Sequence, residues 1–485
     1  MSDMGLSIAA SGLAAALAKI NTASNNLANA TTPGYAAQKV NLSAQFAAGP
    51  LGVGQGVTIL SVSQQTDPVY AAANVAAQGI LGGATQANQI MGSIESIFPE
   101  PSATGIASQL ATLWSDLSTL ATNANQIGSQ QAVIGAAQTL AQTISGSFSR
   151  LGQLSSSLQN QLGSGANDGG ALAQVNSLLG QVAQLNVGIV AGTTGGQNVN
   201  ALIGTRTAAV DQLAGLLGVT ASAGAHGALS VHLNGVELVG GNIAQTLTAT
   251  GSAASANLSI VTGNGVTVNA RGLIGANVAA VNFVIPSYEN QLNSVADSLA
   301  TGINALQANG MNAKGDPGSA IAGAWAGTIL PNIFVSGGSS GTYTTSSGGF
   351  NSAATIAVSP ALLTDPSLIA TASAPGPGNS NVIGTPTFDG TNAQAMAALA
   401  SSATGPDINY RKMIGVLGTE ATNASATSSA ASKMATTAAN SLSSISGVNQ
   451  NAQEIDILAA QNAFQAMAKV VSAITITFQS LLAAV

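Results

Sequence analysis

Apolar side chains recur every three or four residues at both ends of the chain, which predicts a long helix at each end. Steps of three and four place side chains on one stripe of a helix, as in the seam of a coiled coil. The C-terminal stripe consists of Ile457, Ala460, Phe464, Met467, Val471, Ile474, Phe478, Leu481 and Val485. The N-terminal stripe consists of Leu6, Ala10, Leu13, Leu17, Ile20, Ser24 and Leu27. An ordinary core helix also carries one such stripe, but the location of these two suggests that the termini meet each other or neighbouring copies.

Between the two ends the pattern predicts a helical body that is interrupted by β-rich segments. Thr31-Thr32-Pro33-Gly34 ends the first helix, because proline lacks the N–H group and disfavours a helical residue before it. A strand follows at Val57–Val62, and helical periodicity returns from Asp67 to Val190. Between Leu217 and Ile285 the period falls to two and glycines mark the turns, which indicates a small all-β domain.

We therefore predict an α+β multidomain fold with long, coiled-coil-like helical termini, a helical body and inserted small all-β domains. The segment 313–390 is rich in Gly, Ser, Thr and Pro, but it keeps enough Val, Ile and Phe for a small core. The predicted units are a terminal helical assembly domain (1–60 with 440–485), a helical body (61–216 with 286–312 and 391–439), a β domain (217–285) and a Gly/Ser/Thr-rich β insertion (313–390).

The composition adds that the surface must be almost free of charge. The 485 residues include 10 Lys+Arg and 17 Asp+Glu, or 6% charged residues, whereas 46% are hydrophobic. Ordinary soluble domains carry about 25% charged residues. A surface of this kind repels its copies only weakly, which suits a subunit that packs against others. The acidic balance and the absence of a basic patch argue against nucleic acid as a partner.

The absence of cysteine and the sequences of the two terminal segments indicate in which cellular compartment the protein can function. The chain has no cysteine, which removes disulfides, thiolate metal sites and cysteine nucleophiles. Met1–Ile8 contains Asp3 in place of a basic n-region, and no long apolar h-region follows, so any export would use a route other than a secretory signal peptide. The apolar stretch Val470–Val485 is only 16 residues long and contains polar side chains. A spanning helix needs about 20 apolar residues, so we expect no stable membrane insertion.

The motifs that could support catalysis each lack a necessary feature. His226 and His232 are six residues apart, without the His-x-x-x-His spacing of a helical zinc pair. Gly337–Gly341 fits G-x-S-x-G but lies in a Gly/Ser tract without the flanking strand and helix. Gly52–Gly56 lacks the spacing of a dinucleotide-binding loop. We therefore expect no catalytic, metal or cofactor site, and a protein that is not an enzyme.

Two motifs near the ends resemble the axial proteins of the bacterial flagellum. Asn25 to Tyr35, with the sequence NNLANATTPGY, is similar to the N-terminal signature that rod, hook and hook-associated proteins share. Ser446-Gly447-Val448-Asn449 and the helix after it are similar to the C-terminal signature of the hook-associated protein 1 family, which forms the hook–filament junction. The motif residues are Asn26, Asn29, Pro33, Gly34, Tyr35, Gly447, Val448, Asn449 and Gln461. This chain departs from the family at Asn451 and Gln453, where acidic residues are usual, and at Phe464, where tyrosine is usual.

The resemblance implies an extracellular structural subunit of the flagellum that joins hook to filament by polymerisation of its terminal helices. It implies export through the flagellar type III apparatus, and four partners: copies of itself in a ring, hook protein below, a second hook-associated protein above and an export chaperone at the C-terminal helix. The assembly seam would consist of Leu6, Leu13, Leu17, Ile20, Leu27, Ile457, Phe464, Met467, Val471, Ile474, Phe478 and Leu481.

Three alternatives remain open on the sequence alone. A hook, rod or filament protein would share the N-terminal signature, although the length and the two insertions argue against it. A secreted surface adhesin would share the lack of cysteine, but it would need a Sec signal and β repeats. An enzyme on a flagellar scaffold would carry a protease-like insertion at 313–390, where no His-x-x-x-His motif or credible triad is present.

Overall fold

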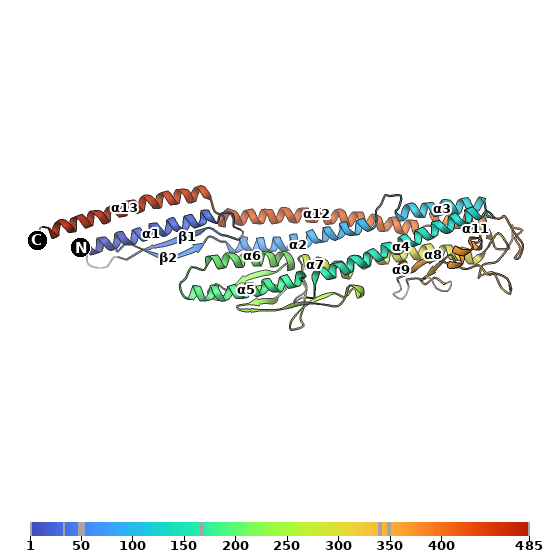
Figure 1. The fold of residues 1–485 in the computed structure, drawn as a ribbon, viewed down its shortest axis with the longest axis horizontal. Helices are drawn as coiled ribbons and strands as arrows, with labels where there is room; N and C mark the ends of the chain where they lie inside the picture. The colour runs from blue at the N-terminus through green and yellow to red at the C-terminus, as the bar shows by residue number, and fades with distance from the viewer. Residues whose placement is uncertain are drawn as a thin grey trace.

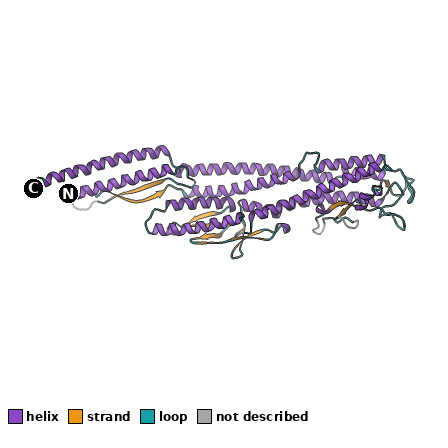
Figure 2. Cartoon of the chain, viewed as in Figure 1, coloured by secondary structure: helices purple, strands orange, loops and turns teal. Residues whose placement is uncertain are grey.

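The protein is a long rod with both chain termini at one end (Figure 1). The computed structural model describes residues 2–32, 34–46, 54–164, 169–337, 342–346 and 351–483, without the side chains of Ser2, Asp3 and Leu481. Pro33, Val485 and the side chain of Leu481, which the sequence singled out, lie outside this description. Most of the rod is helical, and the strands lie in small groups along its length (Figure 2).

Two long helices and a β-hairpin form the end of the rod that holds both termini, which we call the terminal unit. Its elements are α1 (Ser2–Ala28), β1 (Gln38–Ala44), β2 (Val57–Gln64) and α13 (Gln450–Leu482). The strands pair antiparallel, with a bulge between Asn41 and Leu42. In Figure 1, α1 lies between α13 on one side and the hairpin on the other. The predicted terminal helices are therefore present, and they lie side by side.

A bundle of long helices forms the body of the rod. Its helices are α2 (Pro68–Ile97), α3 (Ile106–Thr122), α4 (Ile127–Leu162), α5 (Ala171–Thr194), α6 (Asn200–Leu217), α8 (Ile285–Asn309), α11 (Thr391–Ala397) and α12 (Pro406–Ser446). Asp67 caps α2 by accepting hydrogen bonds from the backbone N–H groups of Val69 and Tyr70, and Pro68 fits the first turn because its missing N–H is not needed there. α12 packs along α2 and ends at Ser446, beyond the expected boundary at 440.

The first β-rich segment packs on α5 as two antiparallel sheets. Their strands are β3 (Thr220–Ala223), β4 (Leu229–Leu233), β5 (Val236–Gly240), β6 (Ile243–Ala244), β7 (Leu247–Thr250), β8 (Ser259–Thr262) and β9 (Thr267–Val268). Helix returns at α7 (Leu273–Ala279) and continues through a π-helix (Ala280–Val284) into α8. We expected strands as far as residue 285. Periodicity alone does not separate a short apolar run in a strand from one in a buried helix.

The insertion at 313–390 consists mainly of loops around two small antiparallel sheets at the far end of the rod. The sheets pair β10 (Gly310–Met311) with β13 (Ala372–Ser373), and β11 (Phe334–Ser336) with β12 (Ile356–Val358). Two short helices accompany them, α9 (Ser352–Thr355) and α10 (Pro360–Thr364). Phe334, Ile356 and Leu362 are buried in a core that the insertion shares with the helical body.

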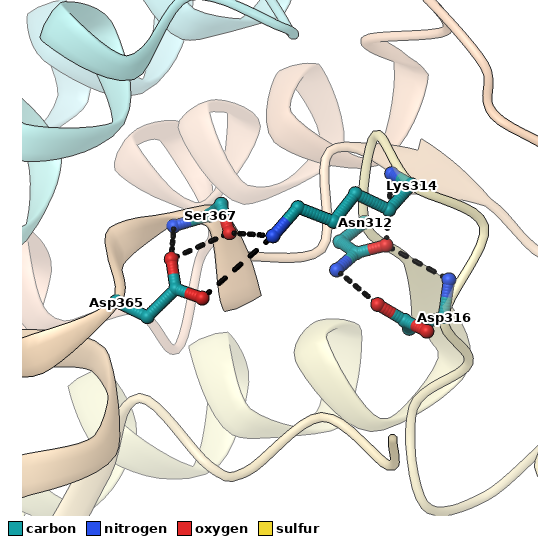
Figure 3. A network of polar contacts seen from close by, with 5 residues as sticks. All are labelled: Asn312, Lys314, Asp316, Asp365 and Ser367. Atoms are coloured by element: carbon teal, nitrogen blue, oxygen red, sulfur yellow. Dashed lines mark hydrogen bonds and ion pairs between the residues drawn. The ribbon is translucent and has the colours of Figure 1, made fainter. Parts of the chain in front are cut away.

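A polar network holds two loops of this insertion together (Figure 3). The Lys314 ammonium donates to Ser367 Oγ at 2.8 Å and lies 3.7 Å from a carboxylate oxygen of Asp365. Asn312 accepts from the backbone N–H groups of Lys314 and Asp316 and closes the turn between them. Hydrogen bonds from Ser367 and the nearby Lys314 lower the pKa of Asp365. The side chains of Lys314 and Asp365 are 62% and 46% exposed, so their ion pair contributes little to stability.

The main hydrophobic core of the described residues runs from Val75 to Leu417 and joins the body, the β-rich segment and the insertion. The terminal unit lies outside these limits in the sequence. The observed helical termini, helical body and inserted sheets confirm the predicted α+β multidomain fold.

Candidate assembly interface

One face of α13 lies against α1. From Gln450 to Ile474 most positions of α13 are exposed, and the remainder are covered in part or in full. The covered positions are Gln453, Ile457, Ala460, Phe464, Met467, Val471 and Ile474. All but Gln453 are positions that the sequence periodicity places on one stripe. Further along, Phe478 is 52% exposed. The stripe therefore serves first as a contact within the chain, and its role between copies stays a prediction.

The facing side of α1 is built from glycine and alanine. A Cβ atom added to Gly12 would lie 3.2 Å from Met467 Sδ, and one added to Gly5 would lie 3.3 Å from Ile474 Cδ1. From Gly12 to Gly5 the chain goes back by seven residues, and from Met467 to Ile474 it goes forward by seven. The two helices therefore run antiparallel. The buried alanines of α1 are Ala9, Ala15, Ala16 and Ala23. Sequence reasoning missed this face, although the seven-residue spacing of small residues could have revealed it.

The predicted leucine stripe of α1 is covered only in part. Leu6, Leu17 and Leu27 are 41%, 49% and 36% exposed, while Leu13 and Ile20 are partly covered. α13 occupies the glycine and alanine face instead, because small residues let two helices approach closely. The two predicted stripes therefore do not meet each other within one chain.

α13 also carries large apolar side chains outside the face that contacts α1. Ile455, Leu458 and Ile476 are each at least 60% exposed. On the hairpin, Phe46 is 94% exposed and Leu60 is 66% exposed. Several large exposed apolar side chains on one unit are typical of an interaction site. The terminal unit thus presents apolar surface on each of its three layers.

Asn26 joins the three layers of the terminal unit. Its Oδ1 accepts hydrogen bonds from the backbone N–H of Gln38 and the hydroxyl of Tyr35, both at 2.8 Å. Its Nδ2 donates to Gln38 O and to Gln453 Oε1, also at 2.8 Å. Asn26 is only 1% exposed, so each of these partners satisfies a buried polar group. Burial also raises the pKa of the Tyr35 hydroxyl, which keeps it protonated as a donor.

The glycines of the two motifs occupy places where a side chain does not fit. Gly34 has φ +75°, and a Cβ atom there would lie 2.9 Å from Gly204 O on α6. A Cβ atom on Gly447 would lie 2.3 Å from Ser443 O. Both positions lie where the terminal unit joins the body, which explains why the chain uses glycine at each.

The remaining motif residues shape the turns beside these glycines. Asn449 caps α13 by accepting from the backbone N–H of Ala452 at 3.1 Å. Asn29 accepts from the Thr32 hydroxyl at 3.3 Å and so closes the turn after α1. Val448 is partly covered and Gln461 is exposed. The structure brings Asn26, Gly34 and Tyr35 near Gly447 through the backbone bond from Ala37 N to Ser446 O, at 2.7 Å.

The histidines and glycine motifs that the sequence analysis considered for catalysis lie far from the terminal unit or outside the described residues. His226 is exposed in a turn with φ 52°, and His232 Nε2 lies 3.9 Å from Glu237 Oε1. Of the Gly337–Gly341 motif, only Gly337 lies within the described residues, and Gly52 lies outside them. Across the described part of the chain, no group of three or more His, Cys, Asp or Glu side chains could hold a metal ion.

One described helix segment, Met4–Ala28, is long and apolar enough to span a bilayer by length and composition alone. Core helices and N-terminal signal sequences meet the same criterion. In the structure this segment packs against α13 and the hairpin, and it contains the hydrogen-bonded Asn26.

Two family descriptions match the chain. The flagellar hook-associated protein FlgK helical domain matches residues 91–321, and the flagella basal body rod protein description matches residues 6–35. The second match covers the N-terminal motif and most of α1. The first covers much of the helical body, the β-rich segment and α8.

Curated relatives and a solved structure agree with these matches. Flagellar hook-associated protein 1 of Escherichia coli is 27% identical over 324 residues, which are 64% of this chain and 58% of the relative. Its counterpart in Bacillus subtilis is 28% identical over 232 residues, or 45% of this chain and 44% of the relative. The aligned part thus spans under two thirds of these relatives. The flagellar hook junction protein FlgK of Burkholderia pseudomallei has a similar fold, with a TM-score of 0.59 and 18% identity over 78% of this chain and all of that one.

The matches lie on the segments that the structure shows as the terminal unit and the body. Together with the hook-associated relatives, they show that this chain is similar to the FlgK family of flagellar hook-associated proteins over its N-terminal motif and its body.

Proposed function

We propose that this protein is a structural subunit that joins the hook of the flagellum to its filament. Copies would form a ring outside the cell through their terminal units, with hook protein below and a second hook-associated protein above. Residues 1–60 with 440–485 would serve as the assembly domain. The far end of the rod, with the insertion at 313–390, would lie away from these contacts.

The observation that supports this proposal is the half-exposed leucine stripe of α1 beside a covered glycine and alanine face. Within one chain, α13 stabilises only one side of α1. Complete burial of a Leu, Ile or Phe side chain contributes about 1.5–3 kcal/mol. Several half-exposed side chains on each copy therefore provide a driving force for association, and it is concentrated at one end of the rod.

The same surfaces need protection before assembly. The outer apolar side chains of α13, among them Leu458 and Ile476, fit the groove of an export chaperone that binds an amphipathic helix. The chain would leave the cell through the flagellar type III apparatus without a cleaved signal peptide. A chain without cysteine passes between reducing and oxidising compartments without redox chemistry.

A strain that lacks this protein tests the proposal. We expect it to build hooks and to release filament subunits into the medium, because filament cannot attach. Loss of a hook or rod protein would instead abolish the hook. Expression of the full chain should restore filaments, whereas a chain without residues 450–485 should not.

A point variant separates assembly from folding. Leu17→Asp places a charge in the exposed stripe of α1, and Leu363→Asp places one at a similarly exposed position in the insertion, where Leu363 is 44% exposed. We expect Leu17→Asp to reduce filament-bearing cells at least tenfold and Leu363→Asp to leave them unchanged. Normal filaments with the truncated chain and with Leu17→Asp would overturn the proposal.

A further inference from the structure

A cavity of about 410 Å³ lies in the body of the rod. It is bounded by the loop between α2 and α3, the first turns of α3, one face of α4 and Tyr410 of α12. α3 and α4 pack side by side in the half of the rod that is far from both termini (Figure 1). Small-molecule pockets in proteins typically measure about 300–1,000 Å³, so this cavity has room for a ligand such as a single sugar ring.

The floor and the rim of the cavity differ in polarity. Ile97, Phe98 and Ile106 line the cavity and are buried, so they form an apolar floor. The rim consists of exposed polar side chains on one face of α4, and these are Thr139, Gln142 and Arg150. The cavity therefore opens to solvent on the α4 side.

The hydroxyl of Ser147 is a buried polar group that the chain leaves unused. Ser147 lines the cavity and is only 5% exposed, yet its hydroxyl has no hydrogen-bond partner in the described part of the chain. Hydroxyl groups on a helix often donate to the carbonyl one turn earlier, as Thr143 does to Thr139 O at 3.0 Å. Ser147 makes no such bond, so its hydroxyl is available to a ligand as donor and as acceptor.

The side-chain amide of Gln109 is satisfied on one side only. Its Nε2 donates to Thr104 O at 2.9 Å, which fixes the orientation of the amide. Its Oε1 is buried and has no partner among the described residues, although Gln109 lines the cavity. Buried polar groups in folded proteins are nearly always hydrogen-bonded. A donor that enters from the cavity would complete the bonding of this amide.

Arg150 gives the rim a positive charge. It is the one charged side chain among the described lining residues, and it takes part in neither of the ion pairs found in the described ranges. The carboxylate of Glu100 approaches the cavity wall, but it accepts hydrogen bonds from the Tyr410 hydroxyl at 3.0 Å and from Ala107 N at 3.1 Å. These two donors stabilise the charge of Glu100, so Arg150 is left for an anion from outside the chain.

We infer that this cavity binds a small polyhydroxylated carboxylate, a sugar acid of the uronate class. A guanidinium group suits a carboxylate, because it donates two parallel hydrogen bonds to it. Ser147 and Gln109 would bond to the hydroxyl groups, and the apolar floor would cover the C–H face of the ring. The cavity lies in the body, so this binding is separate from the proposed junction function.

Titration calorimetry on the full-length protein tests this inference with three matched ligands. Glucuronate carries the carboxylate and the hydroxyl groups, glucose lacks the carboxylate, and acetate lacks the hydroxyl groups. We expect glucuronate to bind at least tenfold more tightly than either of the others. An oligosaccharide that ends in glucuronate identifies the source of the ligand. Tighter binding than that of free glucuronate would indicate the end of an acidic polysaccharide, and weaker binding would indicate a free sugar acid.

Two substitutions assign the polar groups. Arg150→Gln should lower the affinity for glucuronate to that for glucose and leave glucose binding unchanged. Ser147→Ala should weaken glucuronate binding at least fivefold without lowering the Tm, because its hydroxyl has no bond within the chain to lose. A structural role of Ser147 would have the opposite signature, with a lower Tm and an unchanged affinity.

A third substitution fills the cavity and has a matched control on the same helix. A Cβ atom added to Gly146, which lines the cavity, or to Gly135, which does not, would meet no other atom within 4 Å. Both Gly146→Gln and Gly135→Gln should therefore fold. We expect Gly146→Gln to abolish glucuronate binding and Gly135→Gln to leave it unchanged, with normal filaments in both.

Three results would overturn the inference. No glucuronate binding by calorimetry and by ligand-observed NMR would show that the cavity holds only water. Equal affinities for glucuronate and acetate, or for glucuronate and glucose, would exclude the uronate class. Equal loss of binding in Gly146→Gln and Gly135→Gln would place the site elsewhere. The proposed junction function would stand in each case, because filament attachment in the deletion strain tests it separately.

Discussion

The side-chain amide of Asn26 donates a hydrogen bond to Oε1 of Gln453, 2.8 Å away, although the two residues are 427 positions apart in the sequence. This contact ties the start of α13 to the end of α1. The same amide satisfies both backbone groups of Gln38. One buried side chain therefore fixes how the two ends of the chain meet.

Asn26→Ala should loosen the terminal unit without unfolding the body. The change leaves the backbone groups of Gln38 without their side-chain partner, and a buried unsatisfied polar group costs about 1–3 kcal/mol. Hydrogen exchange measured by mass spectrometry should become at least tenfold faster in β1 and in the first turns of α13. Exchange in α4, which is part of the main core, should not change.

Gln453→Glu and Gln453→Leu form the matched pair for this prediction. A carboxylate still accepts the hydrogen bond from Asn26, so Gln453→Glu should behave like the wild type. The leucine side chain accepts nothing, and this variant should resemble Asn26→Ala. Equal behaviour of the two variants would show that the bond does not hold α13.

Substitution of Gly12 should depend on the volume of the new side chain. A Cβ atom would lie 3.2 Å from Met467 Sδ, so Gly12→Ala requires only a small shift of a flexible side chain. Gly12→Leu overfills the contact, which typically costs about 1–3 kcal/mol. Filament formation and protection of α13 should fall for leucine and remain for alanine.

A compensating change makes the prediction specific to this contact. Met467→Ala creates space opposite residue 12 and should restore α13 protection in the Gly12→Leu background. The same Met467→Ala change alone should weaken the packing. If the double variant behaves no better than Gly12→Leu, α1 and α13 do not pack in the register described.

Asp211 should make the stability of the body depend on pH. Desolvation by burial raises the pKa of its carboxyl from 3.8 to about 6, against the hydrogen bond from Asn74 Nδ2, at 3.2 Å. Asn74 Oδ1 is buried and has no partner among the described residues. A protonated Asp211 can donate to it, whereas a carboxylate cannot.

The protein should be more stable at acidic than at alkaline pH because the pKa of Asp211 is raised. The pKa of the Asp211 carboxyl is higher in the folded than in the unfolded state. The stability that its protonated form provides is therefore fully present below about pH 4 and is lost as the pH rises through about 6. A shift of two pKa units corresponds to about 3 kcal/mol. Asp211→Asn, which stays neutral, should stabilise the protein at pH 8 and flatten this pH dependence in urea unfolding. An unchanged pH dependence in Asp211→Asn would contradict the assignment to Asp211.

The terminal unit should open more easily than the body in the isolated protein. Its helices lie outside the main core, and most positions of α13 are exposed. Helices with so little packing are marginal in water. Amide exchange should therefore be fast in α1 and α13 and slow in α4 and α8. Comparable slow exchange in all four helices would mean that the ends are stable without neighbouring copies.

The periodicity of the sequence marks the face of α13 that is covered, but it does not mark the face of α1 that meets it, for one physical reason. Large apolar residues mark a stripe clearly, but they do not reveal which partner covers it. In α1 the closest contact uses Gly5 and Gly12, because the absence of a side chain admits Met467 and Ile474. Glycine contributes nothing to a hydrophobic pattern, so this face was not visible in the periodicity.

Two other differences between the sequence-based prediction and the structure also have simple physical causes. The sequence analysis predicts a β domain that includes the run from Leu273 to Val284, but the buried positions of this run, among them Ile274, Asn277 and Val281, follow helical spacing. The bond from Asn26 to Gln453 was beyond a sequence-based prediction, because it depends on the fold bringing the two ends together. The motif residues were found by resemblance, and their geometric roles emerged only in the structure.

Because the chain enters and leaves the rod at one end, the opposite tip is joined to the terminal unit only through the long helices of the body. Extra residues placed in its loops would neither lengthen the gap between α1 and α13 nor alter their register. That tip is therefore the place where a fluorescent label, an epitope or a whole additional domain can be accommodated while the paired ends remain unchanged.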